Sequence, residues 1–150
     1  MESYKRPSKN EYYLNIALAV SKRSTCLKRH YGAVIINNDE IIATGYNGSP
    51  RNTCNCCDTG ECARLSLPSN TGDYAQCHSV HAEQNALLSA SRNELNGAVM
   101  YLAGEEFDKD IYEKEHRYVY KKMNDCSPCP VCQRMIENAG IKLVIGKNDE

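Results

Sequence analysis

A histidine and a carboxylate stand two residues apart where a helix is expected to begin. The stretch His81-Ala82-Glu83 follows a polar, cysteine-rich region and precedes the apolar run at 86–88. An acidic side chain in a first helical turn complements the positive end of the helix, so the pair can be purely structural. The alternative is a metal ligand beside a group that carries protons.

A second motif, Pro128-Cys129-Pro130-Val131-Cys132, places two cysteines at the start of another predicted helix. Taken alone, Cys-x-x-Cys also occurs in redox pairs and in structural zinc sites. Two thiolates and one imidazole provide three zinc ligands and leave a fourth position for water. Zinc lowers the pKa of that water to roughly 7, and Glu83 would carry its proton to a leaving amine. His-x-Glu followed by Pro-Cys-x-x-Cys is the known signature of zinc nucleobase deaminases, so together the motifs favour catalysis.

Length and composition indicate a globular protein with one domain over residues 1–150. The chain is 41% hydrophobic and 25% charged, and its net charge of -1 argues against non-specific nucleic-acid binding. No apolar run approaches the ~18 residues of a membrane span, and the N-terminus is polar, so we expect a cytoplasmic protein. In a reducing compartment, the nine cysteines are more typical of metal ligands than of disulfides.

Apolar periodicity predicts the elements that must position these residues. Helices are expected at about 11–21 (capped by Asn10), 81–91 and 129–138, the last ending at Gly140. Strands are expected at 33–36 and 41–44, forming a hairpin buried on both faces, and at 98–102 and 141–145. Residues 105–115 are strongly charged and predict a solvated excursion. The predicted fold is α/β, a three-layer α/β/α sandwich with a central mixed sheet of about five strands.

Motifs along nearly the whole chain resemble those of the deoxycytidylate (dCMP) deaminases of the cytidine deaminase superfamily. They are Cys26-Leu27-Lys28-Arg29-His30-Tyr31-Gly32-Ala33-Val34-Ile35, Thr44-Gly45-Tyr46-Asn47-Gly48-Ser49-Pro50-Arg51, His81-Ala82-Glu83-Gln84-Asn85-Ala86, the Cys-x-x-Cys motif, and Asn138-Ala139-Gly140-Ile141. The Gly-Tyr-Asn-Gly loop and the upstream cysteines narrow the resemblance to the dCMP branch.

The resemblance implies a role for each matching residue. His81, Cys129 and Cys132 bind the catalytic zinc, and Glu83 shuttles protons while hydroxide attacks C4 of cytosine, converting dCMP to dUMP and ammonia. Asn47 holds the sugar and base edge, and the backbone amide of Ala82 meets the pyrimidine carbonyl. The alternative for Asn47 is that it serves only its glycine-rich turn.

The long loop at about 47–80 is expected to be stapled by a second, structural zinc ion. The resemblance places its ligands at Cys26, Cys56, Cys62 and Cys77, and four thiolates close a tetrahedral site. Buried free thiols are the alternative. Further residues compete as ligands or are set aside: Cys54, Cys57 and His78 are close enough to bind, whereas Cys126 is expected to pack or react.

A nucleotide substrate needs cations near its 5′-phosphate. Arg51 is the first choice because it follows the Gly-Tyr-Asn-Gly loop, and Arg29, Arg23 and Arg117 are the other candidates. Family members are often homo-oligomers regulated by dCTP and dTTP, and the turn at 48–50 resembles the effector region. The chain departs from longer relatives at about 105–125, a region that shapes the pocket, so the substrate is less well defined than the chemistry.

Two other functions stay open. One is deamination of a free nucleoside, a modified cytosine nucleotide or a tRNA adenosine, although 18 basic against 19 acidic residues does not suggest a tRNA-binding face. The other is a catalytically silent zinc module that binds a nucleotide or partner. Glu83 argues against that module, which would have no need for a proton shuttle.

Overall fold

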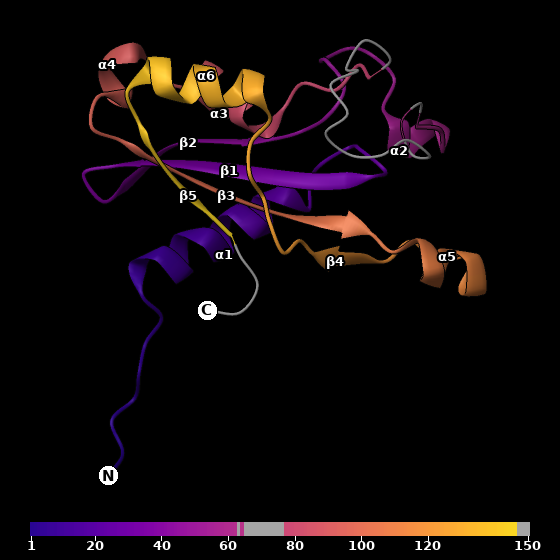
Figure 1. Cartoon of the computed structure of the whole chain (residues 1–150), viewed down its shortest axis with the longest axis horizontal. Helices are drawn as coiled ribbons and strands as arrows, with labels where there is room; N and C mark the ends of the chain where they lie inside the picture. The colour runs from indigo at the N-terminus through magenta and orange to yellow at the C-terminus, as the bar shows by residue number, and fades with distance from the viewer. Residues whose placement is uncertain (63, 65–76, 147–150) are drawn as a thin grey trace.

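A mixed sheet lies between two layers of helices in the computed structural model, which describes residues 1–62, 64 and 77–146 (Figure 1). The described residues form five strands: β1 (Arg29–Asn37), β2 (Glu40–Tyr46), β3 (Val99–Phe107), β4 (Tyr120–Lys122) and β5 (Lys142–Ile145). The order β2-β1-β3-β4 is antiparallel throughout, and β5 pairs with β3 in parallel. The predicted three-layer mixed sheet is therefore confirmed.

Six helices are found in the described residues: α1 (Lys9–Ser21), α2 (Cys56–Thr59), α3 (Ala82–Leu88), α4 (Arg92–Leu95), α5 (Lys109–Glu115) and α6 (Pro130–Ala139). Helix α1 covers one face of the sheet, and α3 and α6 lie side by side on the other (Figure 1). The two helices whose first turns carry the chemical motifs thus share one layer.

Side chains alternate along β1 between two apolar cores, as the pleat of a strand requires. Ala33 and Ile35 point to the core beneath α3 and α6, which also contains Met100, Leu102 and Ile136. Val34 and Ile36 point to the core beneath α1, with Tyr101 and Ala103 from β3. These opposed cores explain the continuous apolar run that predicted β1.

The hairpin was expected to be buried on both faces, and for β2 this was wrong. Strand β2 lies at the edge of the sheet, and Ile41 and Tyr46 are exposed on it, Ile41 at 47%. Apolar β-branched residues also suit a half-exposed edge, so the pattern did not separate the two cases.

The predicted cap of α1 was also wrong. Ser8 caps this helix: its Oγ accepts from the Glu11 N–H at 3.1 Å, and the Glu11 carboxylate accepts from the Ser8 N–H at 2.8 Å. Asn10 instead accepts a hydrogen bond from the Tyr101 hydroxyl. The Ser-x-x-Glu spacing is a capping box, which satisfies two backbone donors where Asn10 would satisfy one.

The segments after the first motif also differ from prediction. The helix expected at 81–91 ends at Leu88, and a new one begins after Ser91, whose Oγ accepts from the Glu94 N–H. Strand β3 runs to Phe107, so residues 105–107 belong to the sheet and only α5 matches the expected excursion.

The ends of the long loop meet directly before the histidine motif. Gly48 and Val80 exchange two backbone hydrogen bonds, of 3.1 and 2.7 Å. Part of the predicted stapled loop, at 63 and 65–76, lies outside the described residues. A search of the described residues finds no helix long and apolar enough to cross a membrane.

Candidate metal centre and substrate cavity

The three residues predicted to bind the catalytic zinc meet at the first turns of α3 and α6. His81 is the N-cap of α3, and Cys129 is the N-cap of α6, followed by Pro130 at the first helical position. The Cys129 Sγ accepts from the backbone N–H of Cys132 at 3.4 Å. One helical turn therefore brings both thiols to the same corner, and the neighbouring helix supplies the imidazole.

The spacing of the ligand atoms fits one zinc ion. The His81 Nδ1 lies 3.5 Å from the Cys129 Sγ and 3.2 Å from the Cys132 Sγ, and all three atoms lie within 4.8 Å of one another. Zinc bonds of about 2.0–2.3 Å at tetrahedral angles separate such atoms by about 3.5 Å. The donor set and its geometry therefore suit a tetrahedral zinc site with one position left for another ligand.

Glu83 is buried beside these ligands, with only 4% of its surface exposed. Burial raises the pKa of its carboxyl group, against smaller opposing effects from a backbone hydrogen bond, from His81 and from the Cys132 thiol. In the protein alone, burial and the nearby Glu83 carboxylate raise the pKa of Cys132. A bound cation would reverse this, because a coordinated thiol is deprotonated outright.

Gly45 lets α3 approach the sheet closely enough to form this corner. A Cβ atom at Gly45 would lie 2.5 Å from the Ala82 carbonyl oxygen and closer still to the Ala86 amide nitrogen. The Asn85 amide group donates to the Tyr46 carbonyl oxygen at 2.8 Å, which ties the same helix to the end of β2. The Gly-Tyr-Asn-Gly motif thus packs against the helix that begins at the histidine motif.

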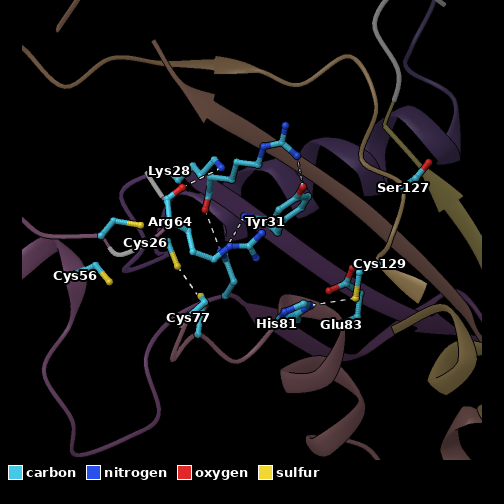
Figure 2. Close-up of a pocket in the computed structure, with 14 residues that line it drawn as sticks. Cys26, Lys28, Tyr31, Cys56, Arg64, Cys77, His81, Glu83, Ser127 and Cys129 are labelled. Atoms are coloured by element: carbon cyan, nitrogen blue, oxygen red, sulfur yellow. Dashed lines mark hydrogen bonds between the residues drawn. The ribbon is translucent and has the colours of Figure 1, made fainter. Parts of the chain in front are cut away.

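A cavity of about 150 Å³ opens beside the ligands. Figure 2 shows His81, Glu83 and Cys129 at one side and the thiols of Cys26, Cys56 and Cys77 at the other. The cavity lining also includes three cations, two polar groups and a further thiol: Lys28, Arg29, Arg64, Asn47, Ser127 and Cys62, with Tyr31 and Ser79 completing it.

Asn47 lines this cavity, and its side chain forms hydrogen bonds outside the glycine-rich turn that contains it. Its Oδ1 accepts from the Tyr31 N–H at 2.7 Å, and its Nδ2 donates to the Arg29 carbonyl oxygen at 2.9 Å. The side chain is 8% exposed and joins the end of β2 to the backbone of β1. These hydrogen bonds hold Asn47 rigidly at the cavity wall.

Ala82, the first residue of α3, is fully buried.

The structure does not bring Arg51 to this cavity. Arg51 and Arg23 line a second, larger cavity of about 670 Å³ between the turn at 48–53 and α3, which contains none of the three ligands. Arg117 is exposed and pairs with Glu115 at 2.6 Å. Of the four predicted arginines, only Arg29 lines the cavity beside the metal centre.

The predicted structural-zinc ligands share the cavity but are not gathered like the first set. Cys26, Cys56, Cys62 and Cys77 all line its wall. Among residues 1–62, 64 and 77–146, however, only the His81 group brings three ligand atoms within 4.8 Å. The competing residues Cys54, Cys57 and His78 are exposed. Cys126 packs in the core at 1% exposure, and burial raises its pKa to about 11, so it is not a reactive thiol.

Sequence reasoning missed Lys28, Arg64, Tyr31 and Ser127 as cavity residues. Lys28 had a usable signal, since it adjoins Arg29 in the Cys-Leu-Lys-Arg motif. Tyr31 is held by a hydrogen bond from Arg29 Nη1 to its hydroxyl at 3.1 Å. Arg64 had no such signal, because the surrounding loop lacks periodicity.

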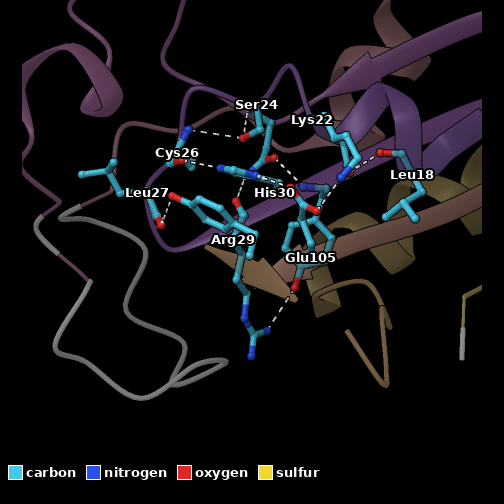
Figure 3. A network of polar contacts seen from close by, with 12 residues as sticks. Leu18, Lys22, Ser24, Cys26, Leu27, Arg29, His30 and Glu105 are labelled. Atoms are coloured by element: carbon cyan, nitrogen blue, oxygen red, sulfur yellow. Dashed lines mark hydrogen bonds and ion pairs between the residues drawn. The ribbon is translucent and has the colours of Figure 1, made fainter. Parts of the chain in front are cut away.

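Figure 3 shows a polar network around the buried side chains of His30 and Glu105, next to the segment that lines the cavity. The two ring nitrogens of His30 lie 2.9 Å from a Glu105 carboxylate oxygen and 2.8 Å from the Cys26 carbonyl oxygen. Lys22 donates to the other Glu105 oxygen at 2.9 Å, and the His30 ring stacks on Tyr120. The network fixes the segment that carries Cys26, Lys28 and Arg29 into the cavity.

Comparison with known proteins places this site in context. The chain is 36% identical over 142 residues to a deoxycytidylate deaminase of Schizosaccharomyces pombe, covering 93% of this chain but only 37% of that protein. It is 32% identical to the deoxycytidylate deaminase of Mycobacterium phage D29, covering 93% of this chain and 94% of the phage protein.

A solved structure shares the fold. The crystal structure of a dCMP deaminase from the cyanophage S-TIM5, in complex with dCMP and dUMP, matches with a TM-score of 0.63 at 27% identity, over 95% of this chain and 83% of that one. A profile of the cytidine and deoxycytidylate deaminase zinc-binding region matches residues 7–147. The chain therefore belongs to the cytidine and deoxycytidylate deaminase family.

Proposed function

We propose that this protein is a zinc-dependent hydrolase that deaminates dCMP to dUMP and ammonia, a step toward dTMP supply. The observation that carries the proposal is a His–Cys–Cys ligand set beside a cavity, which is lined by two of the ligands, His81 and Cys129, by a buried carboxyl group and by basic side chains. The relatives described above are named for the same reaction. The proposed unit is one deaminase domain over residues 1–150.

His81 and the thiolates of Cys129 and Cys132 would hold the zinc ion. When bound, zinc supplies a Lewis acid that makes water nucleophilic at neutral pH. A carboxylate oxygen of Glu83 would take a proton from the attacking water and later release it to the leaving amine. Its place suits both transfers, because the carboxyl group is buried beside the three ligands, next to the position left for water.

Asn47 and Ala82 are proposed to orient the nucleotide. Asn47 already uses one amide hydrogen and its oxygen on β1, and a second amide hydrogen remains for the sugar or base edge. The Ala82 N–H belongs to the first turn of α3, whose amides have no partner within the helix, and it is proposed to meet the pyrimidine carbonyl.

Lys28 and Arg29 are proposed to bind the 5′-phosphate in place of Arg51. Both line the cavity that holds His81, whereas Arg51 lines the other cavity. Burial lowers the pKa of Lys28, and the charges of Arg64 and Arg29 add to this effect. A phosphate group would relieve this crowding of positive charge.

The direct test is conversion of dCMP to dUMP by the purified protein, followed by chromatography, with deoxycytidine, CMP and dCTP in parallel. We expect turnover of dCMP and weak or absent turnover of the others. The Glu83→Gln variant is the matched control, since it should keep its zinc and lose turnover by about 10²- to 10⁴-fold. A zinc-loaded protein that converts none of the four compounds would contradict the proposal.

A second, structural zinc ion is proposed at Cys26, Cys56, Cys62 and Cys77. The support is that all four thiols line one cavity. Burial raises the pKa of Cys26 to about 11, and the charges of Cys77 and Cys56 add smaller increases. Elemental analysis should find two zinc ions per chain, and one in a Cys62→Ser variant. The exposed Cys54 provides the control, because Cys54→Ser should keep both ions.

Oligomeric state, effector binding and cellular location complete the proposed function. We propose a cytoplasmic homo-oligomer with dCTP and dTTP as effectors. The cavity lined by Arg23 and Arg51 supports an effector site, since it combines two cations with the turn at 48–50. Sedimentation velocity tests the oligomer, and a monomer at all protein concentrations would contradict it. The rate of dCMP turnover with and without dCTP tests the effector, and an unchanged rate would contradict it.

A further inference from the structure

The side chain of Gln84 contacts both helices that carry the metal ligands. Its Oε1 accepts a hydrogen bond from the backbone N–H of His81 at 2.9 Å. Its Nε2 donates a weak hydrogen bond to the Met135 Sδ on α6 at 3.9 Å. One half-buried amide thus links the N-cap of α3 to the helix that begins at Cys129.

The first of these contacts fixes the backbone of a ligand. His81 has extended backbone angles, with φ −73° and ψ 154°, and leads into a helix of only 7 residues. So short a helix is marginal by its own propensity and depends on its cap and its packing. The Gln84 side chain occupies the position that Glu or Gln takes in a capping box, three residues after the cap.

The second contact joins the two helices on which the distance between ligands depends. The imidazole comes from the start of α3 and the two thiols from the start of α6, so the ligand spacing depends on how these helices sit together. The Gln84–Met135 contact lies between them, away from the ligand atoms themselves. Partners that orient metal ligands without touching the ion commonly alter its affinity.

We propose that Gln84 is a positioning residue of the metal centre, which holds the His81 backbone in register with the Cys129 and Cys132 thiols. This inference rests on the zinc site of the proposed function, but not on the identity of the substrate. It assigns Gln84 no contact with substrate and no part in proton transfer.

Three substitutions test the role. Gln84→Met keeps the length of the side chain and removes the acceptor, and Gln84→Glu restores an acceptor at the same place. Gln133→Met is the matched control on α6, because the side chain of that glutamine makes an exposed hydrogen bond to Glu137 on the same helix. If Gln84→Met does not fold, Gln84→Ala replaces it, since alanine also lacks the acceptor and favours a helix.

The measurement is zinc affinity by competition with a chromophoric chelator. To distinguish this zinc from the proposed structural zinc, we define it as the zinc that is bound by the wild-type protein but not by a Cys132→Ala variant. We expect Gln84→Met to weaken it by roughly 10- to 100-fold. Gln84→Glu should lose much less than Gln84→Met, because it keeps the acceptor and gives up only the weak contact with Met135, and Gln133→Met should stay near the wild-type affinity.

Two results would overturn the inference. One is a wild-type affinity in Gln84→Met, and the other is an equal loss in Gln84→Met and Gln84→Glu, which would show that the acceptor does not matter. Either result leaves the proposed function intact. A wild-type protein that bound no zinc at all would overturn the proposed function together with this inference.

Discussion

Replacing Gly45 with alanine should move the metal centre without touching any of its ligands. The new Cβ would lie 2.5 Å from the Ala82 carbonyl oxygen, and ordinary contact begins at 3.4 Å. The amide nitrogen of Ala86 also obstructs it. Because this atom and the Ala82 carbonyl oxygen belong to the backbone of α3, no side-chain rotation can relieve the clash. The helix and β2 must separate locally by about 0.9 Å.

This displacement should affect stability and activity to different extents. Overpacking of this kind costs typically about 1–3 kcal/mol of unfolding free energy. His81 and Glu83 move with α3, whereas Cys129 and Cys132 stay with α6. A misplacement of about 1 Å can reduce a rate by about 10²-fold, so we expect that loss in kcat/KM for dCMP, with weaker zinc binding.

Gly32→Ala provides the matched control on the other face of the sheet. A Cβ at Gly32 would collide with the Ala17 carbonyl oxygen and lie 2.5 Å from the Ser21 amide nitrogen, both in α1. Helix α1 carries none of the proposed site residues. Because the contact at Gly32 is the tighter one, urea unfolding should show a loss of stability at least as large in Gly32→Ala, while kcat/KM at a temperature where both are folded should fall mainly in Gly45→Ala.

The reasoning would be refuted by equal kcat/KM values in the two folded variants. It would also be refuted by a Gly45→Ala protein that keeps both its zinc affinity and its rate, because α3 would then be free to shift without disturbing the ligands. Gly146→Ala sets the baseline, since its Cβ would make only an ordinary contact, at 3.5 Å from the Ala103 Cβ.

The other predictions concern charge and metal. Lys28→Met should raise KM for dCMP by roughly 10- to 100-fold, the loss of a charged hydrogen bond, while Arg51→Met should not; equal KM values would contradict the phosphate assignment. Glu105→Gln should lower the unfolding free energy by about 1.5–3 kcal/mol at neutral pH, as measured by urea unfolding, because it weakens the hydrogen bonds that Lys22 and His30 make to a buried carboxylate. Burial favours the neutral acid, but hydrogen bonds from His30 and Lys22 outweigh it and lower the pKa of Glu105. Because the pKa of Glu105 is lower in the folded than in the unfolded protein, the carboxylate stabilises the fold at pH values above its unfolded pKa. This contribution is lost as the pH falls through the folded pKa, so the difference between wild type and variant should shrink in acid. Chelation should abolish dCMP turnover and added zinc should restore it, whereas activity that survives complete removal of zinc would contradict a metal enzyme.

The metal corner was predictable because its geometry is local. Cys129 and Cys132 are one helical turn apart, so a helix beginning at that motif must place both thiols on one side. The apolar run after His81 predicted a helix that begins there, and in the structure His81 is the N-cap of that helix. Only the meeting of the two helices required more than local sequence, and the two-part signature supplied it.

Burial of charge was not predictable in the same way. Residues 105–115 looked like a solvated excursion, yet Glu105 is 7% exposed at the end of β3. Its partners Lys22 and His30 lie 83 and 75 residues away in the chain. A carboxylate is buried only where such partners compensate it, and nothing within its own segment reports their presence.

The same distinction explains why Arg51 lines a different cavity from the metal ligands. Arg51 follows Asn47 closely along the chain, and that proximity made it the first choice. Asn47, however, turns its side chain back across the sheet, to the Tyr31 N–H and the Arg29 carbonyl oxygen. Its neighbours in the cavity are therefore the residues across the β-ladder, including Arg29, while the chain beyond Gly48 leads Arg51 to the other cavity. In a sheet, a loop residue shares its site with the strand that it bonds to, so cations should be sought across the ladder before they are sought along the chain.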